Sequence, residues 1–228
     1  MQKKGVVFMA EKKIPRLVIF DMDGVLVNSE GAFRRACSEA LWQWNVRPEY
    51  DEFQPFTGMG DILYIGGVSE KYGVPYVPEM TDVSYKLYAQ YAPTLLKVFD
   101  WSKKILLKLH SEGVKIAVAS SAGAYKVDIN IGCIGVDKSI FSAIVTGSDV
   151  ENKKPAPDIF LAAARMAGED PENCLVIEDA ISGIQAAKAA GMRVATVCTS
   201  FTAEELAAAG SDHITDDAMT VCDEFFEF

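Results

Sequence analysis

The chain has 228 residues, of which 50% are hydrophobic and 24% are charged, and its formal net charge at pH 7 is -10. This size and composition fit a soluble globular protein with one large domain, or one domain that carries an insertion. The acidic balance argues against nucleic acid or an anionic membrane as the main partner, because both reward clustered Lys and Arg. No apolar run approaches the roughly 20 residues that span a bilayer, so we expect a cytoplasmic protein with no membrane partner.

Residues 1–15 are predicted to be a leader that could be disordered. The short apolar stretch in this segment is interrupted by Glu11-Lys12-Lys13 and is too short for a secretory signal. Met9 is an alternative start to Met1, and the sequence leaves that choice open. The five cysteines are scattered, with no CxxC pair and no Cys/His cluster, so neither a disulfide framework nor a zinc site is expected.

Short apolar runs rich in Val and Ile alternate with amphipathic segments over most of the chain. This alternation predicts an α/β fold, in which helices cover both faces of a parallel sheet. The expected strands are Leu17–Phe20, Lys115–Ala119, Ala143–Thr146, Cys174–Ile177 and Val194–Cys198, with His213–Thr215 as a weak edge strand. The expected helices between them are Trp101–Ser111, Asp158–Ala167, Gly183–Ala190 and Ala203–Ala209.

Residues 30–94 interrupt the alternation and are predicted to be an inserted helical cap. Apolar residues recur at helical spacing in Ala32–Trp44, Asp61–Tyr72 and Val83–Tyr91. The core would then consist of 16–29 and 95–228. Because the insertion begins just after the first strand, we expect it to cover the strand ends as a lid, with hinges at Glu30 and near Leu95.

Two carboxylates follow the first strand, in Asp21-Met22-Asp23-Gly24. Like charges this close raise each other's cost of ionisation unless they share a cation or a proton. The segment therefore predicts a site for a hard metal ion and a carboxylate nucleophile. The alternative is an acidic turn, because Asp and Gly are common turn residues, and these residues alone do not decide between the two.

Polar side chains also follow the next three expected strands. Ser120-Ser121 ends the second strand, where the alternative is a turn or helix-capping serine. Lys154 precedes the stiff turn Pro155-Ala156-Pro157 and could hold a phosphate, or could be a solvated surface lysine. Glu178-Asp179 ends the fourth strand, where acidic residues could simply favour a helix N-terminus.

These strand ends meet if the sheet is parallel, because ligands in such folds bind beyond the carboxyl ends of the strands. Several carboxylates in one crevice need a cation, and oxygen ligands alone favour Mg²⁺. A hydroxyl, backbone amides, a lysine and Mg²⁺ together form a clamp for a phosphoryl group.

In this order the motifs resemble those of the haloacid dehalogenase superfamily of phosphotransferases. They are Asp21-Met22-Asp23-Gly24-Val25-Leu26, Ser120, Lys154-Pro155-Ala156-Pro157-Asp158 and Glu178-Asp179. The insertion resembles the class 1 cap, and the chain is most similar to the beta-phosphoglucomutase and phosphoglycolate-phosphatase group. The resemblance extends from about Arg16 over nearly all of the chain. It implies a Rossmann-like three-layer α/β/α core with a parallel sheet, plus the inserted helical cap.

The resemblance also implies catalytic and metal-binding roles. Asp21 would be the nucleophile that forms an aspartyl-phosphate, and Asp23 the general acid and then the general base. Mg²⁺ would be held by Asp21, the backbone carbonyl of Asp23, and Asp179, with Glu178 either as a further ligand or as a support beside the ligands.

The same resemblance implies a site for the substrate phosphate. Ser120 would hydrogen-bond a phosphoryl oxygen, and Lys154 would neutralise charge and orient Asp21. Backbone N–H groups near Met22 and Ser121 would complete the phosphate site, to which Gly24 also belongs.

The implied function is a Mg²⁺-dependent phosphatase that acts on a small phosphorylated metabolite, such as a sugar or organic acid phosphate. The presence of Asp23 distinguishes the chain from dehalogenases and phosphonate-cleaving relatives. A sugar-phosphate mutase like beta-phosphoglucomutase is the alternative, but mutases carry a basic residue in the cap loop and a histidine after the first motif. Here the loop Phe56–Asp61 has no Arg or Lys, and the histidine's place is near Phe33. A non-catalytic binding protein is disfavoured because unemployed buried carboxylates are costly.

Overall fold

The computed structural model describes residues 14–56 and 60–226. Six strands form one parallel sheet in the order β5-β4-β1-β6-β7-β8. Their bounds are β1 Leu17–Phe20, β4 Lys115–Ser120, β5 Ala143–Thr146, β6 Cys174–Glu178, β7 Arg193–Val197 and β8 His213–Thr215. The predicted leader lies outside the described residues except for its last two positions.

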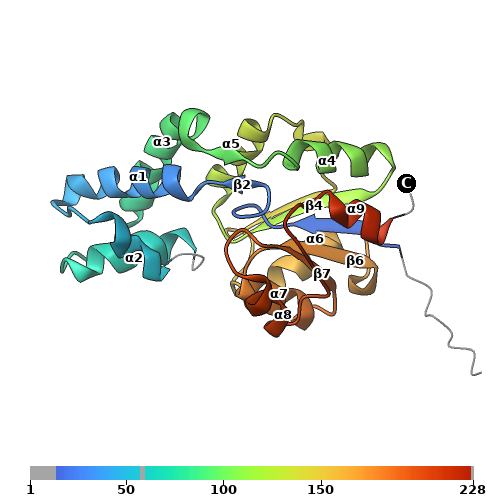
Figure 1. Cartoon of the computed structure of the whole chain (residues 1–228). Coiled ribbons are helices and arrows are strands. Elements are labelled where there is room, and N and C mark those ends of the chain that lie inside the picture. The colour runs from blue at the N-terminus through green and yellow to red at the C-terminus, as the bar shows by residue number, and fades with distance from the viewer. Residues whose placement is uncertain (1–13, 57–59, 227–228) are drawn as a thin grey trace, which may run out of the picture.

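Helices cover both faces of this sheet (Figure 1). One layer contains α4 (Ser102–Ser111), α5 (Ala124–Ile134) and α9 (Thr220–Phe225), and the other contains α6 (Asp158–Ala167), α7 (Ile181–Ala189) and α8 (Ala203–Ala208). Val18 and Phe20 of β1 pack toward the first layer, whereas Leu17 and Ile19 pack toward the second. All four side chains are fully buried, as expected for a central parallel strand. The three-layer α/β/α architecture is confirmed.

All six predicted strands are present, and two extend one residue further than expected. Ser120 is the last residue of β4, and Glu178 is the last residue of β6. Helix α5 was not predicted, although Val127, Ile131 and Ile134 recur at helical spacing and are buried. Two single-turn 3-10 helices, Lys138–Ile140 and Pro171–Asn173, complete the core.

The insertion between β1 and β4 is helical, as predicted. It contains α1 (Glu30–Leu41), α2 (Asp61–Lys71), α3 (Pro78–Leu95) and two 3-10 segments, Trp42–Trp44 and Tyr50–Phe56. These elements have their own hydrophobic core, which includes Phe53, Met80 and Tyr88, and they lie to the left of the sheet in Figure 1. Helix α3 begins earlier than expected because Pro78 occupies its first turn, where the missing N–H of proline costs nothing.

The two segments that connect the cap to the core run side by side. Val27–Asn28 (β2) pairs with Lys97–Val98 (β3) in an antiparallel ladder. Trp101 donates its indole N–H to the Val25 carbonyl at 2.8 Å, which anchors the first connection to the start of α4. The predicted hinges at Glu30 and near Leu95 lie on the cap side of this ladder, and their motion stays a prediction.

The register of the sheet aligns the ends of its central strands. Phe20 of β1 is level with Val118 of β4 and with Ile177 of β6. Asp21 therefore follows β1 at the same edge at which β4 and β6 end. Strand β1 also lies where the order of the strands reverses, which is where open α/β sheets bind their ligands.

Two expectations from composition can be compared with the described residues. All five cysteines are free thiols, and Cys174 is fully buried as a small apolar side chain. Across the ranges 14–56 and 60–226, no helix is both long and apolar enough to cross a membrane.

Candidate active site

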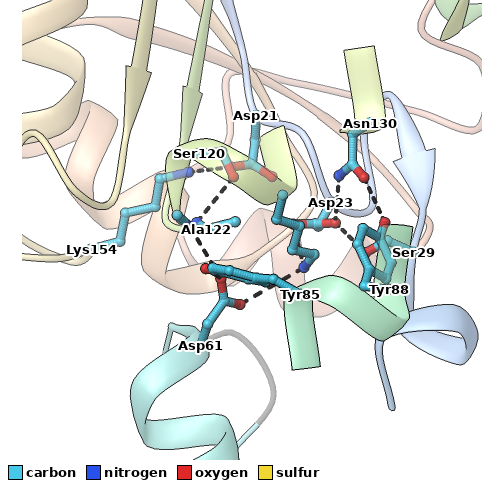
Figure 2. Close-up of polar contacts among 12 residues, drawn as sticks. Asp21, Asp23, Ser29, Asp61, Tyr85, Tyr88, Ser120, Ala122, Asn130 and Lys154 are labelled. Carbon is cyan, nitrogen blue, oxygen red and sulfur yellow. Dashed lines mark hydrogen bonds and ion pairs between the residues drawn. The ribbon is translucent and has the colours of Figure 1, made fainter. Parts of the chain in front are cut away.

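A buried lysine joins two carboxylates at the carboxyl edge of the sheet. The Nζ atom of Lys154 lies 2.5 Å from Oδ1 of Asp21 (Figure 2) and 2.7 Å from Oε1 of Glu178. It also donates to the carbonyl of Ala119 at 3.3 Å, so the three N–H groups of the ammonium have three acceptors. The Lys154 side chain is only 6% exposed. Lys154 therefore holds the Asp21 carboxylate in one orientation, away from bulk water.

Burial affects the pKa values of both Asp21 and Lys154. It raises the pKa of Asp21 to about 7 against the opposing charge of Lys154, and Glu178 adds to the rise. Burial alone would lower the pKa of Lys154, but the charges of Asp21 and Glu178 outweigh it and raise that pKa. The lysine is thus charged at neutral pH, while ionisation of Asp21 is favoured by any further cation in the crevice.

Both oxygens of Glu178 already have protein partners. Oε1 accepts from Lys154, and Oε2 accepts the backbone N–H groups of Asp179 and Ala180, each at 2.8 Å. Ala180 directly precedes α7, so the expected contact with a helix N-terminus is present as well. Of the two roles considered for Glu178, these contacts favour support of Lys154 over direct metal ligation.

Asp179 is 4% exposed and faces the loop that follows β7. Its Oδ2 atom accepts hydrogen bonds from the hydroxyl of Ser200 and, at 3.4 Å, from that of Thr199. Burial raises the pKa of Asp179 well above its ordinary value, and the negative charges of Glu178 and Asp21 act in the same direction. Asp179 is therefore a second buried carboxylate that a cation would stabilise in its ionised form.

Gly24 has no side chain, and the Asp179 carboxyl group occupies the space that a side chain there would fill. The φ angle of Gly24 is +89°, a backbone conformation that favours glycine. Its carbonyl accepts the hydroxyl of Thr199 at 2.6 Å, and its N–H donates to the Val27 carbonyl at 2.8 Å. The N–H of Gly24 is thus used within the chain, and a role for Gly24 at the substrate phosphate stays a prediction.

The donors at this edge fit a hard divalent ion bound by few protein groups. Asp21 and Asp179 supply carboxylate oxygens, and the backbone carbonyl of Asp23 adjoins them in the chain; all are the oxygen ligands that Mg²⁺ prefers. Within the described ranges, no three His, Cys, Asp or Glu side chains are grouped so that they could hold a metal. A Mg²⁺ ion here would thus complete its coordination with water and substrate oxygens, which is how this ion is commonly bound.

The side chain of Asp23 has a separate set of partners. Its Oδ1 atom accepts from the hydroxyl of Ser29 and, at 3.5 Å, from the amide of Asn130 (Figure 2). The Nζ atom of Lys126 lies 3.1 Å from Oδ2 of Asp23. Asn130 is fixed in turn by the hydroxyl of Tyr88, which donates to its Oδ1 at 2.5 Å. Asp21 and Asp23 are two residues apart in the chain but have different hydrogen-bond partners, so the two carboxyl groups can perform different tasks.

The loop after β4 lies beside these carboxylates. Ser120 is 2% exposed, and its hydroxyl oxygen accepts the backbone N–H of Ala122 at 3.2 Å (Figure 2). A Cβ atom at Gly147 would lie 2.1 Å from the carbonyl oxygen of Ser121, so the loops after β4 and β5 pack closely. The Ser120 hydroxyl hydrogen is free to turn toward an oxygen atom in the crevice.

The loop that carries Lys154 is internally braced. Asp149 accepts both the backbone N–H and the hydroxyl of Thr146, each at 2.7 Å, and Lys153 donates to the carbonyls of Gly147 and Val150. These contacts brace the loop from which Lys154 reaches Asp21.

The cap reaches this site through Asp61, the first residue of α2. Its Oδ2 atom accepts the hydroxyl of Tyr85 at 2.6 Å (Figure 2). The same atom accepts the backbone N–H of Gly123 at 3.1 Å. The Oδ1 atom of Asp61 lies 3.9 Å from Nζ of Lys126, which belongs to the core. The preceding loop, Phe56–Asp61, has its centre at 57–59, outside the described residues.

Sequence reasoning missed several residues of the site. Lys126 and Asn130 lie four residues apart on α5 and share a face, but that helix was not predicted. Thr199 and Ser200 follow the fifth predicted strand, so inspection of that strand's end would have found them. Asp61 offered no local signal, because its role depends on how the cap packs on the core.

The chain combines a parallel α/β/α core, a helical cap, and a lysine that joins two carboxylates at the edge of the sheet. This combination is typical of one class of hydrolases. The chain belongs to the haloacid dehalogenase-like hydrolase family, whose sequence profile matches residues 18–197. The expected family is thus confirmed.

Three relatives show how far the similarity extends. The chain is 41% identical over 204 residues to Protein SUPPRESSOR OF QUENCHING 1, chloroplastic, of Arabidopsis thaliana, covering 88% of this chain but 19% of that protein. It is 31% identical over 187 residues to the bifunctional riboflavin kinase/FMN phosphatase of Arabidopsis thaliana, covering 82% and 49% of the two chains. A solved hydrolase from Pseudomonas syringae is similar with a TM-score of 0.74 and 28% identity, covering 92% and 99%.

Proposed function

We propose that this chain is a Mg²⁺-dependent phosphatase that hydrolyses a small phosphorylated metabolite through an aspartyl-phosphate on Asp21. The observation that carries the proposal is the pair of differently held carboxyl groups. Asp21 is fixed by Lys154 at 2.5 Å, and Asp23 is held apart by Lys126 at 3.1 Å. The FMN phosphatase named among the relatives supports the same reaction class.

In the first step a carboxylate oxygen of Asp21 attacks phosphorus, and the bond from phosphorus to the leaving oxygen breaks. Asp23 gives its proton to that oxygen, so the product leaves as an alcohol. The Ser120 hydroxyl donates to a phosphoryl oxygen, and the positive charge of Lys154 beside Asp21 offsets the negative charge of the phosphoryl group. A bound Mg²⁺, held by Asp21, Asp179 and the carbonyl of Asp23, would supply positive charge that reduces repulsion between Asp21 and the phosphate.

In the second step water attacks the phosphorus of the aspartyl-phosphate. Asp23, now ionised, takes a proton from this water, and the bond between phosphorus and the Asp21 oxygen breaks. Inorganic phosphate is released, Asp21 is restored as a carboxylate, and Asp23 is again protonated. Two displacements thus replace a single difficult one.

The test is phosphate release from a panel that contains p-nitrophenyl phosphate, acetyl phosphate and the phosphates of sugars, polyols, acids and nucleotides. We expect Mg²⁺-dependent release that disappears in Asp21→Asn. The matched control is Asp128→Asn, which makes the same change at an exposed carboxylate of the core. A folded wild-type protein with no Mg²⁺-dependent release on the whole panel would contradict the proposal.

A further inference from the structure

Lys126 is a buried cation that the reaction steps above do not employ. Its side chain is 7% exposed, and it reaches from α5 to the boundary between the core and the cap. The Nζ atom lies 3.1 Å from Oδ2 of Asp23, which follows β1, and 3.9 Å from Oδ1 of Asp61, which begins α2 of the cap. One ammonium group therefore touches the carboxyl group assigned to proton transfer and the cap at once.

The surroundings keep this group charged. The carboxylates of Asp23 and Asp61 both lie within 3.9 Å of this ammonium and stabilise its charge. The ammonium also lies 4.3 Å from the ring centre of Phe33 and 6.0 Å from that of Tyr88, and aromatic faces attract cations. A buried charge is costly unless it is paired, so its position depends on both carboxylates.

Asp61 ties the cap to this ammonium and to the start of α5. Its Oδ2 atom accepts the N–H of Gly123, the residue just before α5, where a negative charge is favoured by the helix dipole. The same atom accepts the hydroxyl of Tyr85 from α3 of the cap. A displacement of α2 away from the core therefore breaks the contacts of Asp61 with Gly123 and Lys126, and among the described residues it leaves Lys126 with Asp23 as its one remaining carboxylate.

We propose that Lys126 is a positioning residue, which holds the Asp23 carboxyl group in place for proton transfer only while Asp61 of the cap is docked beside it. The proposal rests on the proposed phosphatase function. It makes protonation of the leaving oxygen dependent on the position of the cap, through the chain of contacts Asp61–Lys126–Asp23. A purely structural lysine would stabilise the fold without this dependence.

Substrates with different leaving groups can distinguish a positioning role of Lys126 from a purely structural one. An alkoxide leaving group needs a proton from Asp23, whereas p-nitrophenolate leaves readily without one. For Lys126→Met we expect kcat/KM to fall about tenfold or more for an alkyl phosphate from the panel, because a positioned acid contributes roughly 10²–10⁴-fold. With p-nitrophenyl phosphate the loss in kcat/KM should stay within about twofold. The value of kcat/KM depends on the steps up to and including the first irreversible one, and in those steps this substrate needs no acid.

The control is Lys138→Met, which removes an exposed lysine whose partner is Asp128 on the surface of the core. It should leave both substrates unchanged. An equal loss on both substrates in Lys126→Met, or no loss on either, would overturn the positioning role. Wild-type protein that hydrolyses neither substrate would instead contradict the phosphatase function itself.

Asp61→Asn keeps the test decisive if Lys126→Met does not fold. It should show the same selective loss with the alkyl phosphate, because Lys126 loses its link to the cap. Where both single variants fold, the double variant should lose no more than the stronger single one, since both act through the same contact. Additive losses would show that Asp61 and Lys126 act independently and would overturn the proposal.

Discussion

A Cβ atom at Gly24 would lie 1.9 Å from Oδ2 of Asp179, far closer than any van der Waals contact. The glycine after the acidic motif is therefore required by a carboxylate that lies more than 150 residues later in the chain. Backbone conformation and close packing both select glycine at this position, since its φ is +89°.

Gly24→Ala should displace Asp179 and thereby reduce phosphatase activity at least tenfold. A tenfold loss corresponds to about 1.4 kcal/mol of lost transition-state stabilisation. The positive φ adds strain of about 1–3 kcal/mol. The control is Gly210→Ala, which has a similar φ of +98° and nothing within 4 Å of the added Cβ. It should show the loss of thermal stability alone. Equal activity in the two variants would contradict the packing argument.

Lys154→Met should abolish activity and lower the free energy of unfolding by about 3–5 kcal/mol, because it leaves buried carboxylates without their cation. The surface pair Lys188–Asp212 provides the control, with the same 2.5 Å separation but side chains that are 37% exposed. Lys188→Met should change stability by about 0–1 kcal/mol and leave activity intact. Urea unfolding and phosphate release measure the two effects. Similar destabilisation in both variants would show that burial adds nothing to the Lys154 contacts.

Two helical glycines should respond in opposite ways to alanine. At Gly183 of α7 the added Cβ would lie 1.8 Å from Oε1 of Glu178, whereas at Gly132 of α5 nothing lies within 4 Å. Gly132→Ala should stabilise the protein by about 0.5–1 kcal/mol through helix propensity. Gly183→Ala should destabilise it and weaken activity, because Glu178 can no longer hold Lys154. Stability from urea unfolding checks the sign, and stabilisation by Gly183→Ala would refute the argument.

Mg²⁺ should bind the folded protein and stabilise it without any substrate. At a concentration 100 times its Kd, the ion should add about 2.7 kcal/mol to the free energy of unfolding. The resulting rise in Tm should be largely lost in Asp179→Asn and retained in the exposed control Asp128→Asn. Chelation should abolish phosphate release, and added Mg²⁺ should restore it. An unchanged Tm rise in Asp179→Asn would exclude Asp179 as a ligand.

The product should distinguish hydrolysis from phosphoryl transfer within a sugar. With beta-glucose 1-phosphate and a bisphosphate activator we expect free phosphate, not the isomeric sugar phosphate. The place of the mutase histidine holds Phe33, which is 4% exposed and lies beneath Lys126. A lysine elsewhere in the cap, Lys71, contacts the Glu52 carbonyl and the Phe56 ring within the cap. Turnover dominated by the isomer would reverse this ranking.

The strands and the acidic motifs were predictable because their signals are local. A run such as Leu17–Phe20 is buried on both faces, so its composition alone marks a central parallel strand. Asp21, Ser120 and Glu178 lie at the ends of such runs, and the parallel arrangement implies that they meet. The contact between Lys154 and Asp21 was expected from the family resemblance, whereas the contact between Lys154 and Glu178 was not.

Contacts between separate elements could be established only from the folded chain. The order of strands and the packing of the cap place Lys126 between Asp23 and Asp61, and no periodicity in the sequence encodes that meeting. Likewise, local composition could not tell whether Glu178 binds a metal or supports a lysine, because the answer depends on which partners its two oxygens meet. Local hydrophobic pattern determines where strands end, whereas long-range packing decides which side chains face one another across those ends.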